Sequence, residues 1–251
     1  MIIDTHIHLN DRKYQDILEE VIKEALENDV ERMIVVGYDR SSSIKAVKMA
    51  SSSDFIYAAV GLHPSDVIKE EDFDLNWLKN LLREPKVIAI GEIGLDYYWN
   101  KNNRDLQITY FKKQLEIARN ANLPIIIHSR DAAMDTYEIL KEHSLPGVLH
   151  CFPYSLEMAR EFIKLGFYLG IGGVLTFKNS RVLKEVVKEI DIKHLLSETD
   201  GPYLTPEPYR GKINRPAYLK YIIDEISEIK KIDSETVLTV LYQNARNLFR
   251  I

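Results

Sequence analysis

The chain has 251 residues, a length compatible with one or two domains, and α/β barrels of about 250 residues often form a single domain. Its 45% hydrophobic and 28% charged residues are typical of globular proteins, which argues against a disordered or fibrous chain. The formal net charge of −5 argues against binding of nucleic acid through bulk positive charge, but it leaves a local basic site open.

The compartment is indicated by what the sequence lacks. Its one cysteine, Cys151, permits no intramolecular disulfide, so the chain needs no oxidising environment. The N-terminal residues 1–14 contain no basic segment followed by an apolar run, and no later stretch approaches about 18 uninterrupted apolar residues. We therefore predict a cytoplasmic protein with no membrane partner.

Short apolar runs alternate with segments of helical period along the whole chain, the pattern of βα units around a parallel sheet. Strands are predicted at Met1–Thr5, Arg32–Val36, Phe55–Val60, Val87–Ile90, Pro124–Ile127, Val148–Cys151, Phe167–Ile171 and His194–Leu196. Helices are predicted at Tyr14–Glu27, Ser42–Ala50, Asp74–Leu82, Leu106–Ala121, Ala132–Glu142, Leu156–Leu165, Ser180–Ile190, Tyr218–Ile229 and Ser234–Phe249, with a long Pro-rich loop at Gly201–Pro216. Eight strands predict an α/β fold, a single-domain (β/α)8 TIM barrel over residues 1–251.

Histidine and carboxylate side chains recur where these strands end, and barrel enzymes place their active sites at that face. In the first strand His6 and His8 alternate onto one side, with Asp4 below them as a possible hydrogen-bond partner. The later strands end at His63, Glu92, His128, His150 and Asp200. One such histidine alone is more often structural, but the joint pattern indicates a metal site; His194, at the start of a strand, has no role in it.

Imidazole and carboxylate together suit Zn²⁺, Mn²⁺, Fe²⁺, Co²⁺ or Ni²⁺, while Mg²⁺ is less natural at nitrogen-rich positions. The histidines at 6, 8, 128 and 150 and the carboxylates at 92 and 200 exceed one tetrahedral site. They suggest two ions with Glu92 as the bridge, a geometry suited to displacement at phosphorus. Cys151 follows His150 directly, so strand alternation predicts that its thiol packs between barrel and helices.

Seven motifs resemble those of the TatD-type metal-dependent deoxyribonucleases, in the same order along the whole chain: DTHIHL, GLHP, GEIGLDYYW, IIIHSRDA, LHCF, SETDGPYL and PYRGKINRPAYL. The resemblance implies a TIM barrel of the metal-dependent hydrolase superfamily that hydrolyses DNA phosphodiester bonds. It further implies a 3′→5′ exonuclease acting on single-stranded or damaged DNA with two divalent ions, Mg²⁺, Mn²⁺ or Zn²⁺.

Carried over to this sequence, the resemblance implies that His6, His8, Glu92 and Asp200 hold one ion. Glu92, His128 and His150 would hold the second, and His63 would contact the scissile phosphate. Asp200, Glu92 and His63 are then the expected catalytic residues, with Asp200 orienting the attacking water and taking its proton.

The sequence departs from the family pattern in three loops that would touch substrate. Ser65 follows GLHP where the family commonly has His, Pro153 and Tyr154 follow HCF in place of Ser-Gly, and Arg215 stands where an acid is usual. These departures concern substrate preference rather than the metal ligands.

We expect His63, Arg130 and Tyr203 to bind substrate, because guanidinium groups suit phosphate and aromatic rings stack on bases. For the other cations of these loops, substrate binding and ordinary solvated charge are equally open: Arg210, Lys212 and Arg215. For each of the other aromatic residues, loop packing is favoured over substrate binding: Tyr97, Tyr98, Trp99, Tyr154 and Tyr209. Asp96 and Asn214 are compatible both with orienting ligands and with structural hydrogen bonds.

Two other function classes remain open. A metal-dependent amidohydrolase or deaminase on the same barrel would attack carbon, and many such enzymes bridge their ions with a carbamylated lysine where this chain has Glu92. A non-catalytic metal-binding module predicts an incomplete ligand set, yet every expected ligand is present. The nuclease is therefore the favoured interpretation.

Overall fold

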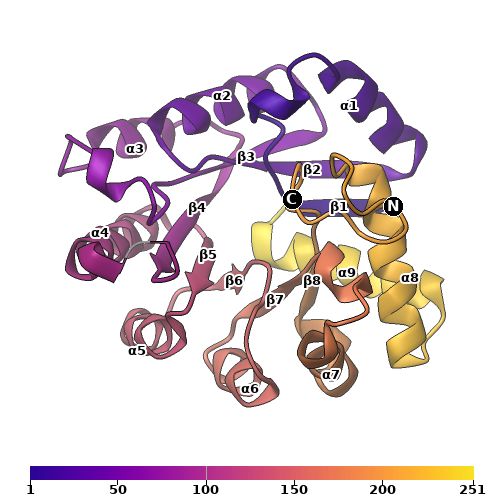
Figure 1. Cartoon of the computed structure of the whole chain (residues 1–251). Coiled ribbons are helices and arrows are strands. Elements are labelled where there is room, and N and C mark those ends of the chain that lie inside the picture. Colours follow the sequence, from indigo (N-terminus) through magenta and orange to yellow (C-terminus); the bar gives the residue numbers. More distant parts are fainter. Residues whose placement is uncertain (100) are drawn as a thin grey trace.

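Eight parallel strands follow one another in chain order, each paired with the next, in a computed structural model that describes residues 1–99 and 101–251 (Figure 1). The strands are β1 (Ile2–Ile7), β2 (Val30–Val36), β3 (Ile56–Val60), β4 (Val87–Asp96), β5 (Ile125–Arg130), β6 (Gly147–Leu149), β7 (Tyr168–Ile171) and β8 (Leu195–Ser197). Each overlaps a predicted strand, and the predicted TIM barrel is confirmed.

The barrel closes between β8 and β1 through the chain just past β8. The backbone N–H of Asp200 donates to the carbonyl of His6 (2.9 Å), and that of His8 donates to the carbonyl of Gly201 (2.8 Å). Thr5 adds a bond from its hydroxyl to the carbonyl of Ser197 (3.0 Å). These bonds bring the first and last strands' polar side chains to one place.

Helices surround the strands on the outside (Figure 1). They are α1 (Leu18–Glu27), α2 (Arg40–Ser51), α3 (Asn76–Leu81), α4 (Arg104–Ala121), α5 (Ala133–His143), α6 (Leu156–Lys164), α7 (Arg181–Glu189), α8 (Leu219–Lys230) and α9 (Ser234–Phe249). Single 3₁₀ turns occur as well, among them η4 (Gly173–Thr176) directly before α7. Among the described residues, none of the helices has the length and apolar character needed to span a bilayer.

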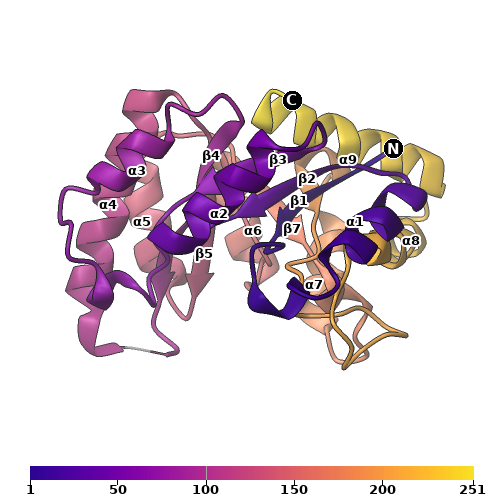
Figure 2. The same ribbon diagram turned by 90° about the horizontal axis from the view of Figure 1, so that it is seen from above.

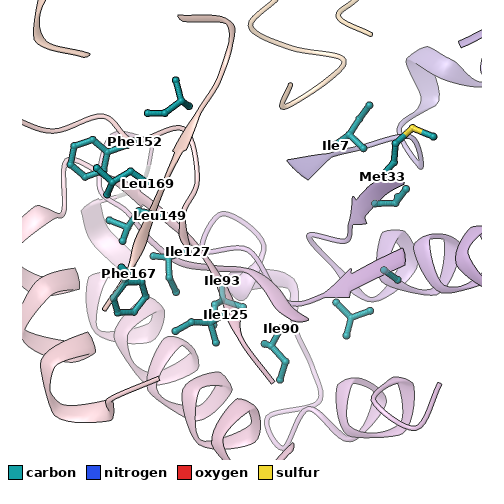
Figure 3. Close-up of a cluster of buried hydrophobic side chains, with 14 of the residues drawn as sticks. Ile7, Met33, Ile90, Ile93, Ile125, Ile127, Leu149, Phe152, Phe167 and Leu169 are labelled. Atoms are coloured by element: carbon teal, nitrogen blue, oxygen red, sulfur yellow. The ribbon is translucent and has the colours of Figure 1, made fainter. Parts of the chain in front are cut away.

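Two apolar layers hold this arrangement together. The outer layer lies between strands and helices and includes Ile90, Ile93, Ile125, Ile127, Leu149 and Phe167 (Figure 3). The inner cluster takes the alternate strand residues, such as Ile126, Val148 and Leu196, and packs them against Leu248 and Phe249 of α9. Figure 2 shows α9 on the side where the chain begins, so it covers that end of the barrel.

The polar site is a continuation of the inner layer. His128, His150 and Glu198 come two positions after Ile126, Val148 and Leu196, and a spacing of two keeps side chains on the same side of a strand. The inner side of the barrel therefore changes from apolar to metal-binding residue types toward the carboxyl ends of the strands.

β4 ends at Asp96 rather than at the predicted Ile90. Its residues Ile93–Asp96 continue to pair with Ile127–Arg130 of β5 after a shift in register between Ile90 and Ile93. Glu92 therefore lies within a strand and not after one, and it is 4% exposed.

Candidate metal centre

Four of the expected ligands converge where β1, β4 and the end of β8 meet. The Nε2 atoms of His6 and His8 are 3.2 Å apart, and each lies 3.6 Å from Oε2 of Glu92. Oδ1 of Asp200 lies 3.7 Å from the first of these nitrogens and 3.5 Å from the second. All four atoms thus face one small volume.

A second group gathers around the other oxygen of the same carboxylate. Oε1 of Glu92 lies 2.8 Å from Nδ1 of His128 and 2.8 Å from Nε2 of His150, and these two nitrogens are 3.3 Å apart. Nε2 of His63 is 3.7 Å from the same oxygen. Each oxygen of Glu92 therefore faces a different set of histidines.

Hydrogen bonds fix some of these rings. Nδ1 of His8 lies 2.9 Å from the carbonyl of Val36 and must donate to it, which leaves Nε2 free to bind a metal. Nε2 of His128 lies 3.0 Å from Oδ2 of Asp96, so Asp96 orients this ring. Asp96 is held in turn by the backbone N–H of Tyr98, which donates to its Oδ1 (2.9 Å).

Burial and mutual charge set the ionisation of the site. Burial, with repulsion from His150, lowers the pKa of His6 to about 4, and burial likewise lowers the pKa of His63 to about 3. Burial opposes ionisation of Glu92 and Asp200, but the surrounding histidines outweigh it and lower the pKa of both carboxylates. Glu92 attracts the proton of His150 and raises its pKa well above the usual value, against the effect of burial.

The donor set fits divalent metal ions. Ligand atoms about 2.0–2.2 Å from one ion at tetrahedral angles lie about 3.3–3.6 Å apart. The Nε2 atoms of His6 and His8 lie 3.2 Å apart and 3.5–3.7 Å from the nearest oxygens of Glu92 and Asp200, and both carboxylates are ionised inside a buried pocket. Nδ1 of His150 has no hydrogen-bond partner among the described residues, whereas its Nε2 lies 2.8 Å from Oε1 of Glu92 and donates to that ionised carboxylate, so an ion held there would replace this proton.

The structure places two residues differently from the sequence-based expectation. Asp4 accepts hydrogen bonds from the backbone N–H of His6 (3.3 Å) and from the backbone and hydroxyl of Thr199 (3.0 and 2.6 Å), and among the described residues no hydrogen bond joins it to the rings of His6 or His8. Cys151 does not turn away from the site, because β6 ends at Leu149 and Cys151 has a left-handed backbone with φ of 43°. Its Sγ lies 3.9 Å from Oδ2 of Asp200.

Glu198 is a buried carboxylate that the sequence-based prediction missed. Its side chain accepts a hydrogen bond from the backbone N–H of Cys151, and its Oε1 lies 3.8 Å from Nδ1 of His150. Burial raises its pKa to about 7. A Cβ at Gly170 would lie 2.4 Å from its Oε2, so only glycine leaves room for it. Its spacing of two from Leu196 was the signal that points it into the barrel.

A cavity of about 470 Å³ opens over the metal centre. Besides the ligands, its lining includes His63, Ser65, Trp99, Arg130 and Tyr203. The guanidinium of Arg130 lies 3.9 Å from the ring centre of Tyr98, and no carboxylate of the described residues pairs with it. The expected substrate-binding residues His63, Arg130 and Tyr203 thus share one cavity with the ligands.

Most of the other candidate residues are engaged elsewhere. Arg215 pairs with Glu20 and Glu24 of α1 (2.6 and 2.7 Å), and Asn214 donates to the carbonyls of Thr199 and Tyr203. The remaining side chains pack within loops: Tyr97 on Asp135, Tyr154 on Ser129, Tyr209 on Tyr218, Arg210 on Phe177 and Lys212 on Tyr209. In the structure these groups stabilise the rim of the site rather than line the cavity over the metal centre.

Comparison with known proteins gives a family for this geometry. The family model described as TatD related DNase matches residues 3–250. The metal-dependent hydrolase YabD of Bacillus subtilis is 50% identical, with 100% of both chains covered, and YcfH of Escherichia coli, also named a metal-dependent hydrolase, is 32% identical over 100% of this chain and 96% of its own. The crystal structure of YjjV, a TatD homologue from Escherichia coli K12, superposes with a TM-score of 0.95 at 30% identity and covers 100% of this chain and 98% of that chain. The chain is therefore a metal-dependent hydrolase and belongs to the TatD related DNase family.

Proposed function

We propose that the protein is a divalent-metal-dependent deoxyribonuclease, a 3′→5′ exonuclease that acts on single-stranded or damaged DNA. The observation that carries the proposal is the position of Glu92, whose two oxygens face two histidine groups at 2.8–3.6 Å. The cavity above it also contains Arg130, which pairs with no carboxylate in the part of the chain that the structure describes. That arrangement suits a phosphodiester, which presents negative oxygens to be neutralised.

In this proposal His6, His8, Glu92 and Asp200 hold one ion, and Glu92, His128 and His150 hold the other. Divalent ions supply the positive charge that acidifies water and neutralises phosphate oxygens. Glu92 would help to hold both ions, because it is buried and its two oxygens face separate histidine groups.

Asp200 takes the proton of the attacking water. Its Oδ1 faces His6 and His8, while its Oδ2 lies 3.9 Å from the thiol of Cys151. Burial and the charge of Asp200 raise the pKa of that thiol, so Cys151 stays protonated and does not act as a nucleophile.

His63 and Arg130 hold the phosphate. The backbone N–H of Ser65 donates to Nδ1 of His63 (3.1 Å), so the proton of this neutral ring is on Nε2 and is available to a phosphate oxygen. Arg130, at the carboxyl end of β5, offers its planar guanidinium in the same cavity. Tyr203, fixed by a hydrogen bond from its hydroxyl to Asp11 (3.1 Å), presents its ring to a base.

Digestion of a single-stranded oligonucleotide tests the proposal. Substrates labelled at the 3′ or the 5′ end are incubated with protein and Mg²⁺, Mn²⁺ or Zn²⁺, with EDTA as the blank and Asp200→Asn as the variant. We expect metal-dependent release of mononucleotides from the 3′ end, and an Asp200→Asn protein that binds the oligonucleotide but does not cleave it. Metal-loaded protein that cleaves no DNA would instead favour the amidohydrolase chemistry.

A further inference from the structure

A second cavity, of about 570 Å³, lies beside the metal centre between the chain after β6 and the segment from η4 into α7. The thiol of Cys151 belongs to both places: it lines this cavity and lies 3.9 Å from Oδ2 of Asp200. The cavity thus begins one side chain away from the carboxylate that takes the proton in the proposed reaction. Its volume falls within the range of about 300–1,000 Å³ usual for small-molecule sites.

The walls are apolar and held in place. Phe152 is buried, and Tyr154 is fixed by the bond between its hydroxyl and that of Ser129 (2.7 Å) and by stacking on Phe162. Tyr154 is one of the positions at which this sequence departs from its family's pattern. A rigid aromatic wall is suited to stacking against a flat ring.

The mouth of the cavity is apolar too, although it faces solvent. Val182 of α7 is 52% exposed and Leu204, from the loop after β8, is 39% exposed, and both line the cavity. Leu204 belongs to the same loop as Tyr203, which lines the cavity over the metal centre. Apolar surface left uncovered at a rim is a feature of binding sites.

Charge distinguishes this cavity from its neighbour. No lining residue carries a carboxylate, and Arg181 at the mouth has none within 4 Å among the residues that the structure describes. On the other side of Tyr154 lies a cavity of the same volume that contains Asp131 and Asp135, the latter paired with Arg104 at 2.8 Å. Of these two cavities, the first suits a neutral aromatic ring attached to an anionic phosphate backbone, because its walls are apolar and its charged lining residue is the cation Arg181.

We propose that this cavity binds the nucleobase of the nucleotide that flanks the scissile phosphate, with the phosphate on the metal centre. The base stacks on Tyr154, its edges face Asn179 and Ser180, and Arg181 attracts the next phosphate. The inference rests on the proposed function and adds to it. One base is held in this cavity, on the Cys151 side of the metal centre, while Trp99 and Tyr203 face the rest of the DNA substrate.

The test compares diesters with and without a base. The substrates are thymidine 5′-(p-nitrophenyl phosphate), thymidine 3′-(p-nitrophenyl phosphate) and methyl p-nitrophenyl phosphate, and the quantity is the ratio of kcat/KM for each thymidine ester to that for the methyl ester. Val174→Phe fills the cavity from η4, and Val182→Phe narrows its mouth from an exposed position that tolerates larger side chains. We expect the ratio for one thymidine ester to fall about tenfold in both variants.

Ala133→Phe is the matched control, because it fills the neighbouring cavity on the acidic side of Tyr154. Its ratios should equal those of the wild type. Ratios that stay unchanged in Val174→Phe and Val182→Phe, or that fall equally in Ala133→Phe, would overturn the assignment of the cavity.

Binding without catalysis separates this inference from the proposed function. Saturation-transfer NMR of thymidine with metal-free protein in EDTA should show contact with the wild type and with Ala133→Phe, and a clear loss with Val174→Phe. If no diester is hydrolysed with any metal, the nuclease proposal fails while the NMR result still decides the cavity. Equal thymidine signals in all three proteins would reject a base site.

Discussion

Glu92 is the residue on which the metal centre depends most, because each of its oxygens faces a separate histidine group and it is buried between them. Its neighbour Asp200 does not take the same place, because it lies 3.7 and 3.5 Å from His6 and His8 but forms no ion pair with His128 among the described residues. Loss of Glu92 should therefore affect both groups at once.

We predict that Glu92→Ala lowers kcat/KM on DNA by at least about a thousandfold and reduces bound metal, with the fold retained. Mass spectrometry of bound metal, circular dichroism and digestion of DNA check the three parts. Glu228→Gln, an exposed acid on α8, is the control and should change none of them. Full activity with full metal content in Glu92→Ala would refute the two-metal proposal.

Glu198 acts through its neighbours rather than on substrate. It holds the backbone N–H of Cys151 and lies beside Nδ1 of His150, so it fixes the turn from which that histidine extends. We predict that Glu198→Gln lowers activity about 10–100-fold, because partners of ligands have effects of that size. Metal titration should show weaker binding in the variant; a change in melting temperature with unaltered metal affinity would assign Glu198 a purely structural role.

At the scale of elements, the loop after β8 is attached to α1 at the outside of the barrel. Arg215 pairs with Glu20 and Glu24, although the family pattern has an acid at this position. Both acids come from one helix, so the pairing fixes the loop after β8 to α1.

Arg215→Ala should therefore leave kcat/KM on DNA within about twofold and lower the free energy of unfolding by about 1 kcal/mol, the usual effect of partly exposed ion pairs. Chemical denaturation and oligonucleotide digestion measure the two quantities. A large rise in KM with unchanged stability would show that Arg215 contacts phosphate after all.

The elements were largely predictable from the sequence, and the exceptions have physical causes. Periodicity identified all eight strands because each combines a short apolar run with an adjoining amphipathic helix. The predicted end of β4 at Ile90 was wrong. Gly91 and Gly94 are residues typical of turns, yet the strand continues to Asp96 and pairs with β5. Glu198 could have been found by strand alternation alone.

Other features depend on contacts that no local pattern contains. The direction of Cys151 follows from a left-handed backbone one residue after His150, and alternation rules do not hold outside a strand. The ion pairs of Arg215 join positions far apart in the chain, so the sequence could indicate its charge but not its partner.

At the scale of the whole molecule, metal binding and stability are linked. An ion that binds only the folded protein at about 100 times its Kd adds about 2.7 kcal/mol of stability. For a chain of this size that corresponds to a rise in Tm of about 5–10 °C. Differential scanning calorimetry with and without Zn²⁺ or Mn²⁺ should show this rise, and Glu92→Ala should abolish it.

The rise should also depend on pH. Without metal, the carboxylates raise the pKa of His8, His128 and His150 despite burial, so protons compete with the ion for these nitrogens. Glu92 and Asp200 have lowered pKa values and stay ionised between about pH 6 and pH 8, so over this range the histidines are the ligands whose protonation changes. The gain in Tm should be larger at pH 8 than at pH 6; an equal gain at both would contradict proton competition.

The position of α9 against the end of the barrel has a consequence during synthesis. Leu248 and Phe249 cover the inner apolar cluster, yet Leu248 is synthesised 51 residues after Ser197, the last residue of β8. A nascent chain with all eight strands outside the exit tunnel still exposes Ile126, Val148 and Leu196 at the open end. Folding chaperones would therefore meet this chain mainly in the interval before α9 is complete.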